Sequence, residues 1–198
     1  MRHGRLFTTC VVGLLLDGCG PTSRVDLDTL RTMEHQLADG AVVAGRSLFG
    51  AGHTLVLTLD PECPLCLMHA PELAQLTSGT GLSIVGLYAS PYIVPDSAQA
   101  FAERNGFRFP QVMDPDCRIA QALDAVVTPE AFVLAVDGTV LYRGAIDDRA
   151  TRAGRKKPKA TRHHLRDALA AVERGHPPAE PSVRAVGCFL ECNEVRTP

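Results

Sequence analysis

The sequence contains no tryptophan, and aromatic residues make up only 5% of its 198 residues. Surfaces that bind sugars or nucleic-acid bases by stacking need aromatic rings, so this composition argues against both. Neither charge sign is in large excess, because the formal net charge is −2 at pH 7. We therefore see no electrostatic reason to expect nucleic acid or an anionic membrane surface as a partner.

Long apolar runs are also missing after the first twenty residues, where no stretch could span a bilayer. The first residues instead form a targeting pattern, with a basic start followed by an apolar run over residues 6–16. That run is too short to span and has the length of a signal-peptide core. It ends in Asp17-Gly18-Cys19, which resembles the bacterial lipobox except at Asp17.

This pattern predicts a signal peptide over residues 1–18 and lipidation of Cys19. The protein would then be exported to the periplasmic or cell-envelope side, with the lipid anchor as its membrane attachment. A plain secretory signal with an incidental cysteine at position 19 is the alternative.

Seven cysteines are present. Signal-peptide removal would take Cys10 away and lipidation would use Cys19. The thiols that remain are Cys63, Cys66, Cys117, Cys188 and Cys192. Exported proteins meet oxidising conditions, so these thiols are candidates for disulfides. Because five is an odd number, at least one thiol is free or bonded outside the molecule.

The patterns after residue 50 alternate between strand and helix. Two β-prone runs, residues 54–59 and 82–88, are separated by a helical segment, which makes them parallel neighbours. Asp137-Gly138 between two further β-prone runs predicts an antiparallel hairpin. The order strand, helix, strand, helix, hairpin, helix predicts an α/β fold with a central mixed sheet flanked by helices.

Three regions follow the signal peptide in this interpretation. Residues 19–50 are weakly patterned and are predicted to be a linker or lead-in. Residues 51–176 form the α/β domain. Residues 177–198 form an extended tail that contains Cys188 and Cys192.

The motif Cys63-Pro64-Leu65-Cys66 stands between the first strand and the first helix of the domain. Free N–H groups and the positive end of the helix dipole favour a thiolate at the first cysteine. We therefore expect Cys63 to be the nucleophile in thiol–disulfide exchange and Cys66 to resolve the mixed species. No metal or other cofactor is needed for this chemistry.

Two cysteines at this spacing are also half of a zinc site, which needs two further ligands. The pair Cys188 and Cys192 could supply them. A metal-binding or metal-delivery module that uses Cys63 and Cys66 therefore stays open as an alternative function.

Further residues around the motif resemble the thioredoxin superfamily. Pro71, five residues after Cys66, matches the proline that bends the active-site helix in that superfamily. Thr128-Pro129, just before a strand, resembles its cis-proline, which lies against the redox cysteines. The resemblance implies a thioredoxin-like fold and a substrate groove formed by Thr128 and Pro129.

A tail signature runs through residues 142–148, 161–169, 177–178 and 186–188. It resembles the C-terminal signature of bacterial redoxin-domain proteins of the alkyl hydroperoxide reductase/thiol-specific antioxidant group, in its peroxiredoxin-like branch. The similarity covers residues 53–190 and includes Val186-Gly187-Cys188 near its end. It implies a thiol–disulfide oxidoreductase that acts on protein thiols or disulfides or on small thiols. Cys188 matches the tail cysteine of this group and would be an auxiliary redox cysteine that exchanges with Cys63 or Cys66. Cys192 lies outside the matched pattern and is a further candidate for an auxiliary redox cysteine. A local disulfide between Cys188 and Cys192 is the alternative.

Peroxide is the substrate in a second alternative, a thiol peroxidase with antioxidant activity that uses Cys63. Peroxiredoxins carry a threonine three residues before the reactive cysteine, and that position here is Asp60. They also pair the thiolate with an arginine, for which Arg118 and Arg143 are the candidates. The C-x-x-C motif therefore favours disulfide exchange over peroxide reduction.

Three smaller expectations concern residues near the domain surface. We expect His69 to be exposed on the helix and Cys117 to be buried as a small apolar residue. The neighbouring carboxylates Asp147 and Asp148 are expected to hold the basic loop of residues 149–159.

Overall fold

The computed structural model describes residues 23–78, 81–152 and 155–192. The expected signal peptide and Cys19 lie outside these ranges. The helices are α1 (Leu27–Thr32), α2 (Gly45–Leu48), α3 (Pro64–Leu73), α4 (Pro95–Asn105), α5 (Arg118–Ala122) and α6 (His164–Glu173). Within the described ranges, no helix has both the length and the apolar character needed to cross a membrane.

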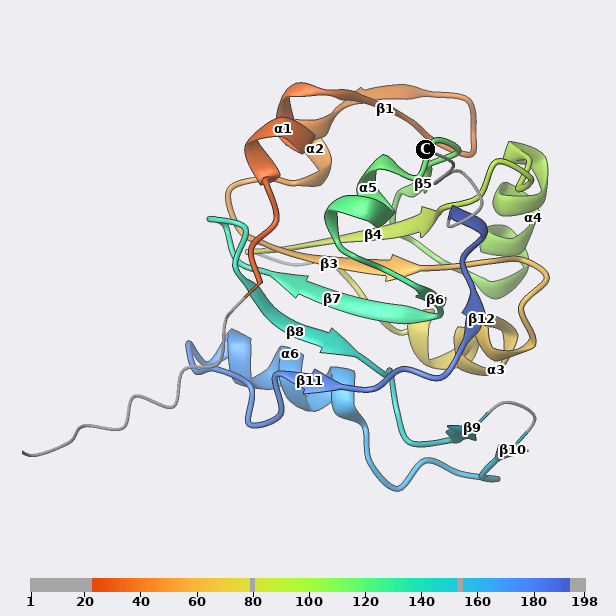
Figure 1. Cartoon of the computed structure of the whole chain (residues 1–198), viewed down its shortest axis with the longest axis vertical. Coiled ribbons are helices and arrows are strands. Elements are labelled where there is room, and N and C mark those ends of the chain that lie inside the picture. The colour runs from red at the N-terminus through yellow and green to blue at the C-terminus, as the bar shows by residue number, and fades with distance from the viewer. Residues whose placement is uncertain (1–22, 79–80, 153–154, 193–198) are drawn as a thin grey trace, which may run out of the picture.

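The strands are β1 (Glu34–Gln36), β2 (Val42–Ala44), β3 (His53–Thr58), β4 (Leu82–Tyr88), β5 (Gln111–Met113), β6 (Val127–Thr128), β7 (Glu130–Leu134), β8 (Val140–Gly144), β9 (Ala150–Arg152), β10 (Arg155–Lys156), β11 (Ser182–Val183) and β12 (Cys188–Phe189). Six of them form the central sheet in the order β11-β8-β7-β3-β4-β5. The strands β3, β4 and β5 are parallel, whereas β7 is antiparallel to both β3 and β8. The expected mixed sheet flanked by helices is confirmed (Figure 1).

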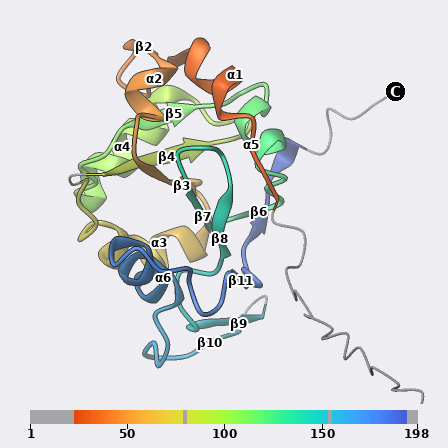
Figure 2. The same ribbon diagram turned by 90° about the vertical axis from the view of Figure 1, so that its left-hand side faces the viewer.

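Each face of the sheet carries its own apolar core, because side chains alternate along a strand. Val56 points to the face covered by α1, α2 and α5. Its neighbours Leu55 and Leu57 point to the other face, where they pack against α3, α4 and α6. The turned view shows these helices on both sides of the strands (Figure 2). Burial on both faces explains the continuous apolar run of β3.

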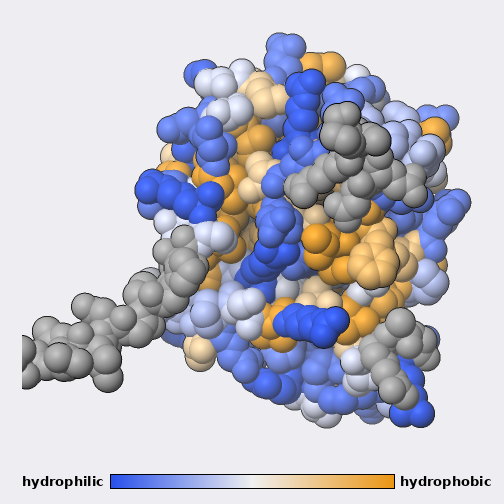
Figure 3. All heavy atoms as spheres, in the orientation of Figure 1, coloured by the Kyte–Doolittle hydropathy of each residue, from blue (hydrophilic) through white to orange (hydrophobic). Residues whose placement is uncertain are grey.

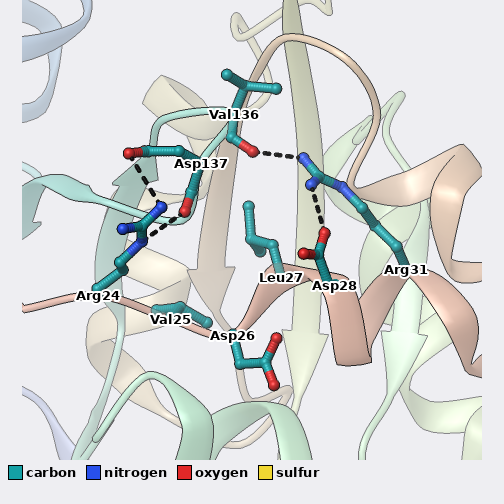
Figure 4. Close-up of a pocket in the computed structure, with 8 residues that line it drawn as sticks. All are labelled: Arg24, Val25, Asp26, Leu27, Asp28, Arg31, Val136 and Asp137. Carbon is teal, nitrogen blue, oxygen red and sulfur yellow. Dashed lines mark hydrogen bonds and ion pairs between the residues drawn. The ribbon is translucent and has the colours of Figure 1, made fainter.

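The N-terminal segment differs from the expected linker, because residues 23–50 belong to the folded domain. Leu30 of α1 and Phe49 after α2 are buried in the core on the first face. The Arg31 guanidinium donates to the Val136 carbonyl oxygen at 2.8 Å, which attaches α1 to the end of β7 (Figure 4). The sequence signal for this segment was the helical spacing of a few leucines. They are buried because α1 and α2 cover one face of the central sheet.

The C-terminal tail is likewise part of the domain rather than a free extension. After α6 it adds β11 to the sheet edge beside β8, and then β12 pairs antiparallel with β6. The tail crosses the face of the domain in blue in Figure 1. A disulfide between Cys117, which caps α5, and Cys192 fixes its end.

Because the N-terminal segment packs into the core, we expect Leu30→Ala to lower stability strongly. Leu30 is 3% exposed, and its truncation leaves a cavity against the sheet. The free energy of unfolding should fall by about 2–5 kcal/mol, as measured by urea denaturation. Val42→Ala, at a side chain that is 62% exposed, is the control. Equal, small effects of the two changes would show that α1 is dispensable to the core.

Candidate active site

The site forms where β3 ends and α3 begins. The Asp60 side chain accepts a hydrogen bond from the Glu62 N–H at 2.7 Å, and the Cys63 N–H donates to the Asp60 carbonyl at 3.3 Å. These bonds turn the chain so that Cys63 becomes the N-cap of α3, with Pro64 in the first helical turn. Proline suits this position because the missing N–H would be unpaired there in any case.

Cys63 is bonded to Cys188 of the tail, and not to Cys66. Cys66 is a free thiol, fully buried one turn into α3. The structure therefore shows no disulfide within the C-x-x-C motif, and its first cysteine is bonded to Cys188 instead. A local bond between Cys188 and Cys192 is also not formed, because Cys192 is bonded to Cys117.

Cys117 is buried, as expected, but it is half of a disulfide rather than a simple apolar side chain. The four-cysteine version of the metal site is thereby contradicted, since three of its members are in disulfides. Sequence reasoning missed the bond between Cys117 and Cys192, whose partners are 75 residues apart along the chain.

Thr128 is the residue that brings the sulfurs together. The peptide bond between Thr128 and Pro129 is cis, as the resemblance implied. The Cys63 Sγ lies 3.3 Å from the Thr128 carbonyl oxygen, and the Cys66 Sγ lies 3.2 Å from its hydroxyl oxygen. Cys188 is the residue directly opposite Thr128 in the β12–β6 pairing. All three cysteines of the site therefore meet at one buried threonine.

The cis-proline segment is fixed to the sheet by Thr58 at the end of β3. The Thr58 hydroxyl donates to the Val127 carbonyl at 2.9 Å and accepts from the Glu130 N–H at 2.8 Å. These two bonds bracket Thr128 and Pro129. A rigid support of this kind keeps the threonine in register with the helix that carries Cys63 and Cys66.

Burial raises the pKa of the Cys66 thiol to about 12, although the Thr128 hydroxyl and the Asp60 backbone N–H act in the opposite direction. A thiol with this pKa is protonated at neutral pH. Burial also raises the pKa of Tyr88, which lies near Cys66 and Asp60. The interior of the site thus holds a neutral, protected thiol beneath a disulfide.

Gly187 allows the tail to approach the cis-proline segment. A Cβ atom at this position would overlap the backbone of Thr128. The close approach of two backbones is a common reason for a glycine in an extended segment. The glycine next to Cys188 is therefore a sequence signal for the tail contact, and it stood in the Val186-Gly187-Cys188 motif.

A groove of about 570 Å³ runs beside this contact, between the tail and strands β6 and β8. Glu130 forms part of its wall and is 4% exposed. Its Oε1 accepts from Arg143 Nε at 2.9 Å, whereas its Oε2 is buried without a hydrogen-bond partner. Apolar surface borders the groove over β12 (Figure 3), where the Phe189 side chain is 81% exposed.

The two arginine candidates have carboxylate partners elsewhere. Arg143 is bonded to Glu130 and also lies near Asp124, and Arg118 pairs with Asp116 at 3.4 Å. The structure gives neither guanidinium a contact with Cys63. This arrangement differs from the arginine–thiolate pair that the peroxidase interpretation requires.

His69 is buried rather than exposed, which corrects the expectation for this residue. Its Nδ1 lies 3.5 Å from the Asp147 carboxylate and 3.1 Å from the Arg149 guanidinium. Among the described residues, His69, Glu72 and Asp147 form the group whose spacing could suit a metal ion. Arg149 bonds to all three, so a cation already occupies the centre of the group.

The two aspartates hold the basic loop as expected. Asp147 accepts from the Arg149 N–H at 2.8 Å, and Asp148 accepts from Lys157 Nζ at 2.6 Å. These bonds tie the loop to the two carboxylates that follow β8.

The fold and the three cysteines around a cis-proline define a thioredoxin-like redox protein. A model of the AhpC/TSA family matches residues 28–143, which is more than half of the chain, and the chain belongs to this family. No curated protein sequence matches the chain.

Solved structures are similar in fold. A hypothetical protein from Sinorhizobium meliloti 1021 is 23% identical with a TM-score of 0.72, and the match covers 88% of this chain and 96% of that chain. The bacterioferritin comigratory protein of Xanthomonas campestris, described for alkyl peroxide reduction, is 18% identical with a TM-score of 0.52 over 76% and 95% of the chains. A secreted disulfide oxidoreductase of Mycobacterium tuberculosis is 23% identical with a TM-score of 0.50 over 57% and 83%.

Glu130→Gln is predicted to change how stability depends on pH. Burial raises the pKa of Glu130, and Arg143 partly offsets this effect. A raised folded-state pKa means that the native state holds its proton more tightly than the unfolded chain, whose pKa is about 4.3. The stability that this proton contributes is present below that value and is lost as pH rises through the folded-state pKa.

The unfolding free energy of the native sequence should therefore fall relative to that of Glu130→Gln as pH rises from about 4 to about 7. Urea denaturation at several pH values measures this difference. Glu34→Gln, at an exposed glutamate, is the matched control. A difference between the native sequence and Glu130→Gln that is constant with pH would contradict the prediction.

Proposed function

We propose that this protein is an extracytoplasmic thiol–disulfide oxidoreductase in which Cys63 is the nucleophile and Cys66 the resolving thiol. The observation that carries the proposal is the placement of Cys63 at the N-terminus of α3, in a disulfide, with a second thiol beside the same threonine. An N-terminal helix position favours the thiolate form of Cys63 once its disulfide is reduced. Cys63 would then attack a partner disulfide, and Cys66 would displace the partner from the mixed disulfide.

The surface around the site supports a protein partner rather than a small thiol alone. Phe189 is 81% exposed and Val126 is 41% exposed, and both border the groove beside Cys188. Exposed apolar side chains that gather around a groove are typical of protein interaction sites. The partner would present a cysteine on an accessible segment that reaches this groove.

Two disulfides within the described residues support a location outside the cytoplasm. Structural disulfides persist in oxidising compartments and are rare where thiols are kept reduced. With the targeting pattern before residue 20, this supports export and attachment through a lipid on Cys19. Cys19→Ser is expected to move the protein from the membrane fraction to the soluble fraction of lysed cells, and retention in the membrane would contradict the anchor.

The function is tested by the reduction of a disulfide-containing protein such as insulin, with dithiothreitol as electron donor. Cys63→Ser should lower the rate at least about 100-fold, to the background of dithiothreitol alone, because the attacking sulfur is lost. Cys10→Ser with Cys19→Ser removes two cysteines outside the described residues and is the matched control. Activity that survives in Cys63→Ser would exclude Cys63 as the nucleophile.

Thiol peroxidase activity is the second candidate, because a disulfide between a helix N-terminal cysteine and a distant cysteine is also the product of peroxide reduction. Asp60 stands where the threonine of peroxiredoxins would be, and both arginine candidates are bonded elsewhere. We therefore expect hydrogen peroxide to be consumed no faster than by dithiothreitol alone. Rapid consumption that is lost in Cys63→Ser would reverse the order of the two candidates.

A further inference from the structure

The three sulfurs of the site differ in their access to solvent. Cys66 is fully buried and Cys63 is 2% exposed, whereas Cys188 is half-buried on the outer strand β12. With the tail in place, Cys188 is the more exposed of the two bonded cysteines, and Cys63 is almost wholly covered. The proposed reaction of Cys63 with a partner therefore needs either removal of the tail or transfer through Cys188.

We propose that Cys188 is a third catalytic cysteine, which exchanges its bond to Cys63 with Cys66 and so carries reducing equivalents between the buried pair and the partner. This inference rests on the proposed function and names the residue that faces the partner. The disulfide that the structure shows, between Cys63 and Cys188, is then one of two interconverting forms. The other form has Cys63 bonded to Cys66 and a free Cys188.

The exchange step is balanced within the chain. Cys66 loses its proton and its sulfur attacks the Cys63 sulfur, so that the bond between Cys63 and Cys66 forms. The bond between Cys63 and Cys188 breaks, and Cys188 leaves as a thiolate that takes up the proton. One disulfide and one thiol are present before and after this exchange, so it consumes no oxidant or reductant.

Electrons reach the partner from the fully reduced chain. Cys188 attacks the partner disulfide and releases one partner thiol, and Cys63 then attacks the Cys188 sulfur, which forms the Cys63–Cys188 bond and releases the second partner thiol. An external dithiol such as dithiothreitol reduces the disulfide left in the chain and is itself oxidised.

The geometry around Thr128 supports this exchange. Cys63 and Cys66 contact two oxygens of the same residue, and Cys188 is paired with that residue across β6 and β12. Thiolate attack needs sulfur atoms that can meet without a large rearrangement. Thr128 favours this because all three cysteines lie beside it.

The tail can release Cys188 without leaving the domain. The β12 pairing is only two residues long. Beyond it, the disulfide between Cys117 and Cys192 joins the tail to α5, and both of its cysteines are buried. Before it, β11 is paired with β8. Cys188 therefore lies on a short segment tethered at both ends, which keeps it near Cys63 after its bond breaks.

The exchange is tested on the oxidised whole chain carrying Cys10→Ser and Cys19→Ser, in which one thiol remains. This chain is treated in its folded state with N-ethylmaleimide, without reductant. It is then digested, and the labelled and disulfide-linked cysteines are identified by peptide mass. Because Cys66 is buried, we expect the label on Cys188 at least about tenfold more than on Cys66, with Cys63 now linked to Cys66. Cys66→Ser in the same background has no thiol left to exchange and should stay unlabelled.

Two outcomes would overturn the proposal. One is label on Cys66 while the bond between Cys63 and Cys188 stays intact. The other is a native chain that takes no label, although the denatured chain takes one per molecule. Suppose that either result is found while the native sequence reduces insulin and Cys63→Ser does not. The exchange would then be rejected and the proposed function would stand. Insulin reduction that persists in Cys63→Ser would instead reject the proposed function.

A second variant shifts the equilibrium without removing a sulfur. Gly187→Ala places a Cβ against the Thr128 backbone and should weaken the pairing of β12 with β6. In the air-oxidised protein the peptide that links Cys63 to Cys66 should then increase at the expense of the one that links Cys63 to Cys188. Gly50→Ala, where a Cβ meets only ordinary contacts, is the matched control. A variant whose linkage pattern equals that of the control would contradict the exchange.

Discussion

The contact between Thr128 and the sulfurs is the interaction on which the site depends. The residue is fully buried, and its two oxygens lie within 3.3 Å of Cys63 and Cys66. Its backbone is also the edge to which β12 pairs. Thr58 supports the segment from the sheet on either side of the cis-proline. A single residue thus couples the active-site helix, the central sheet and the tail.

This coupling explains why the tail is part of the site. Gly187 lets the backbone of the tail reach Thr128, where Cys188 can bond to Cys63. Cys63 and Cys66 are both buried beside this contact, and burial raises the pKa of Cys66 to about 12. Burial therefore protects the inner thiol from oxidants and at the same time limits its nucleophilicity, because only the thiolate attacks.

Most of the fold, and the pair Cys63 and Cys66 of the site, could be predicted from local sequence patterns. Alternation and turn residues predicted the sheet and the hairpin, and the spacing of Cys63 and Cys66 predicted a redox pair. The place of Thr128 and Pro129 beside that pair came from the resemblance to the thioredoxin superfamily. The resemblance offered Cys188 as an exchange partner of Cys63 or Cys66, but local patterns could not choose between this bond and one to Cys192, since Cys188 is 125 residues from Cys63 along the chain. His69 was misjudged for a similar reason: a histidine on a helix is buried only because the distant Asp147 and Arg149 receive it.

The two disulfides have different roles because their surroundings differ. Each closes a long loop, of 125 and 75 residues of separation, and so each restricts the unfolded chain to a similar degree. Cys117 and Cys192 are both buried, and the free thiol among the described residues, Cys66, lies in the other apolar core, so their bond holds the tail in place. In the bond between Cys63 and Cys188, Cys188 is a half-buried residue, and the neighbouring Cys66 is a free thiol. Since exchange requires both access and an attacking thiol, the redox chemistry that we propose falls on the bond between Cys63 and Cys188, while the bond between Cys117 and Cys192 preserves the geometry around it.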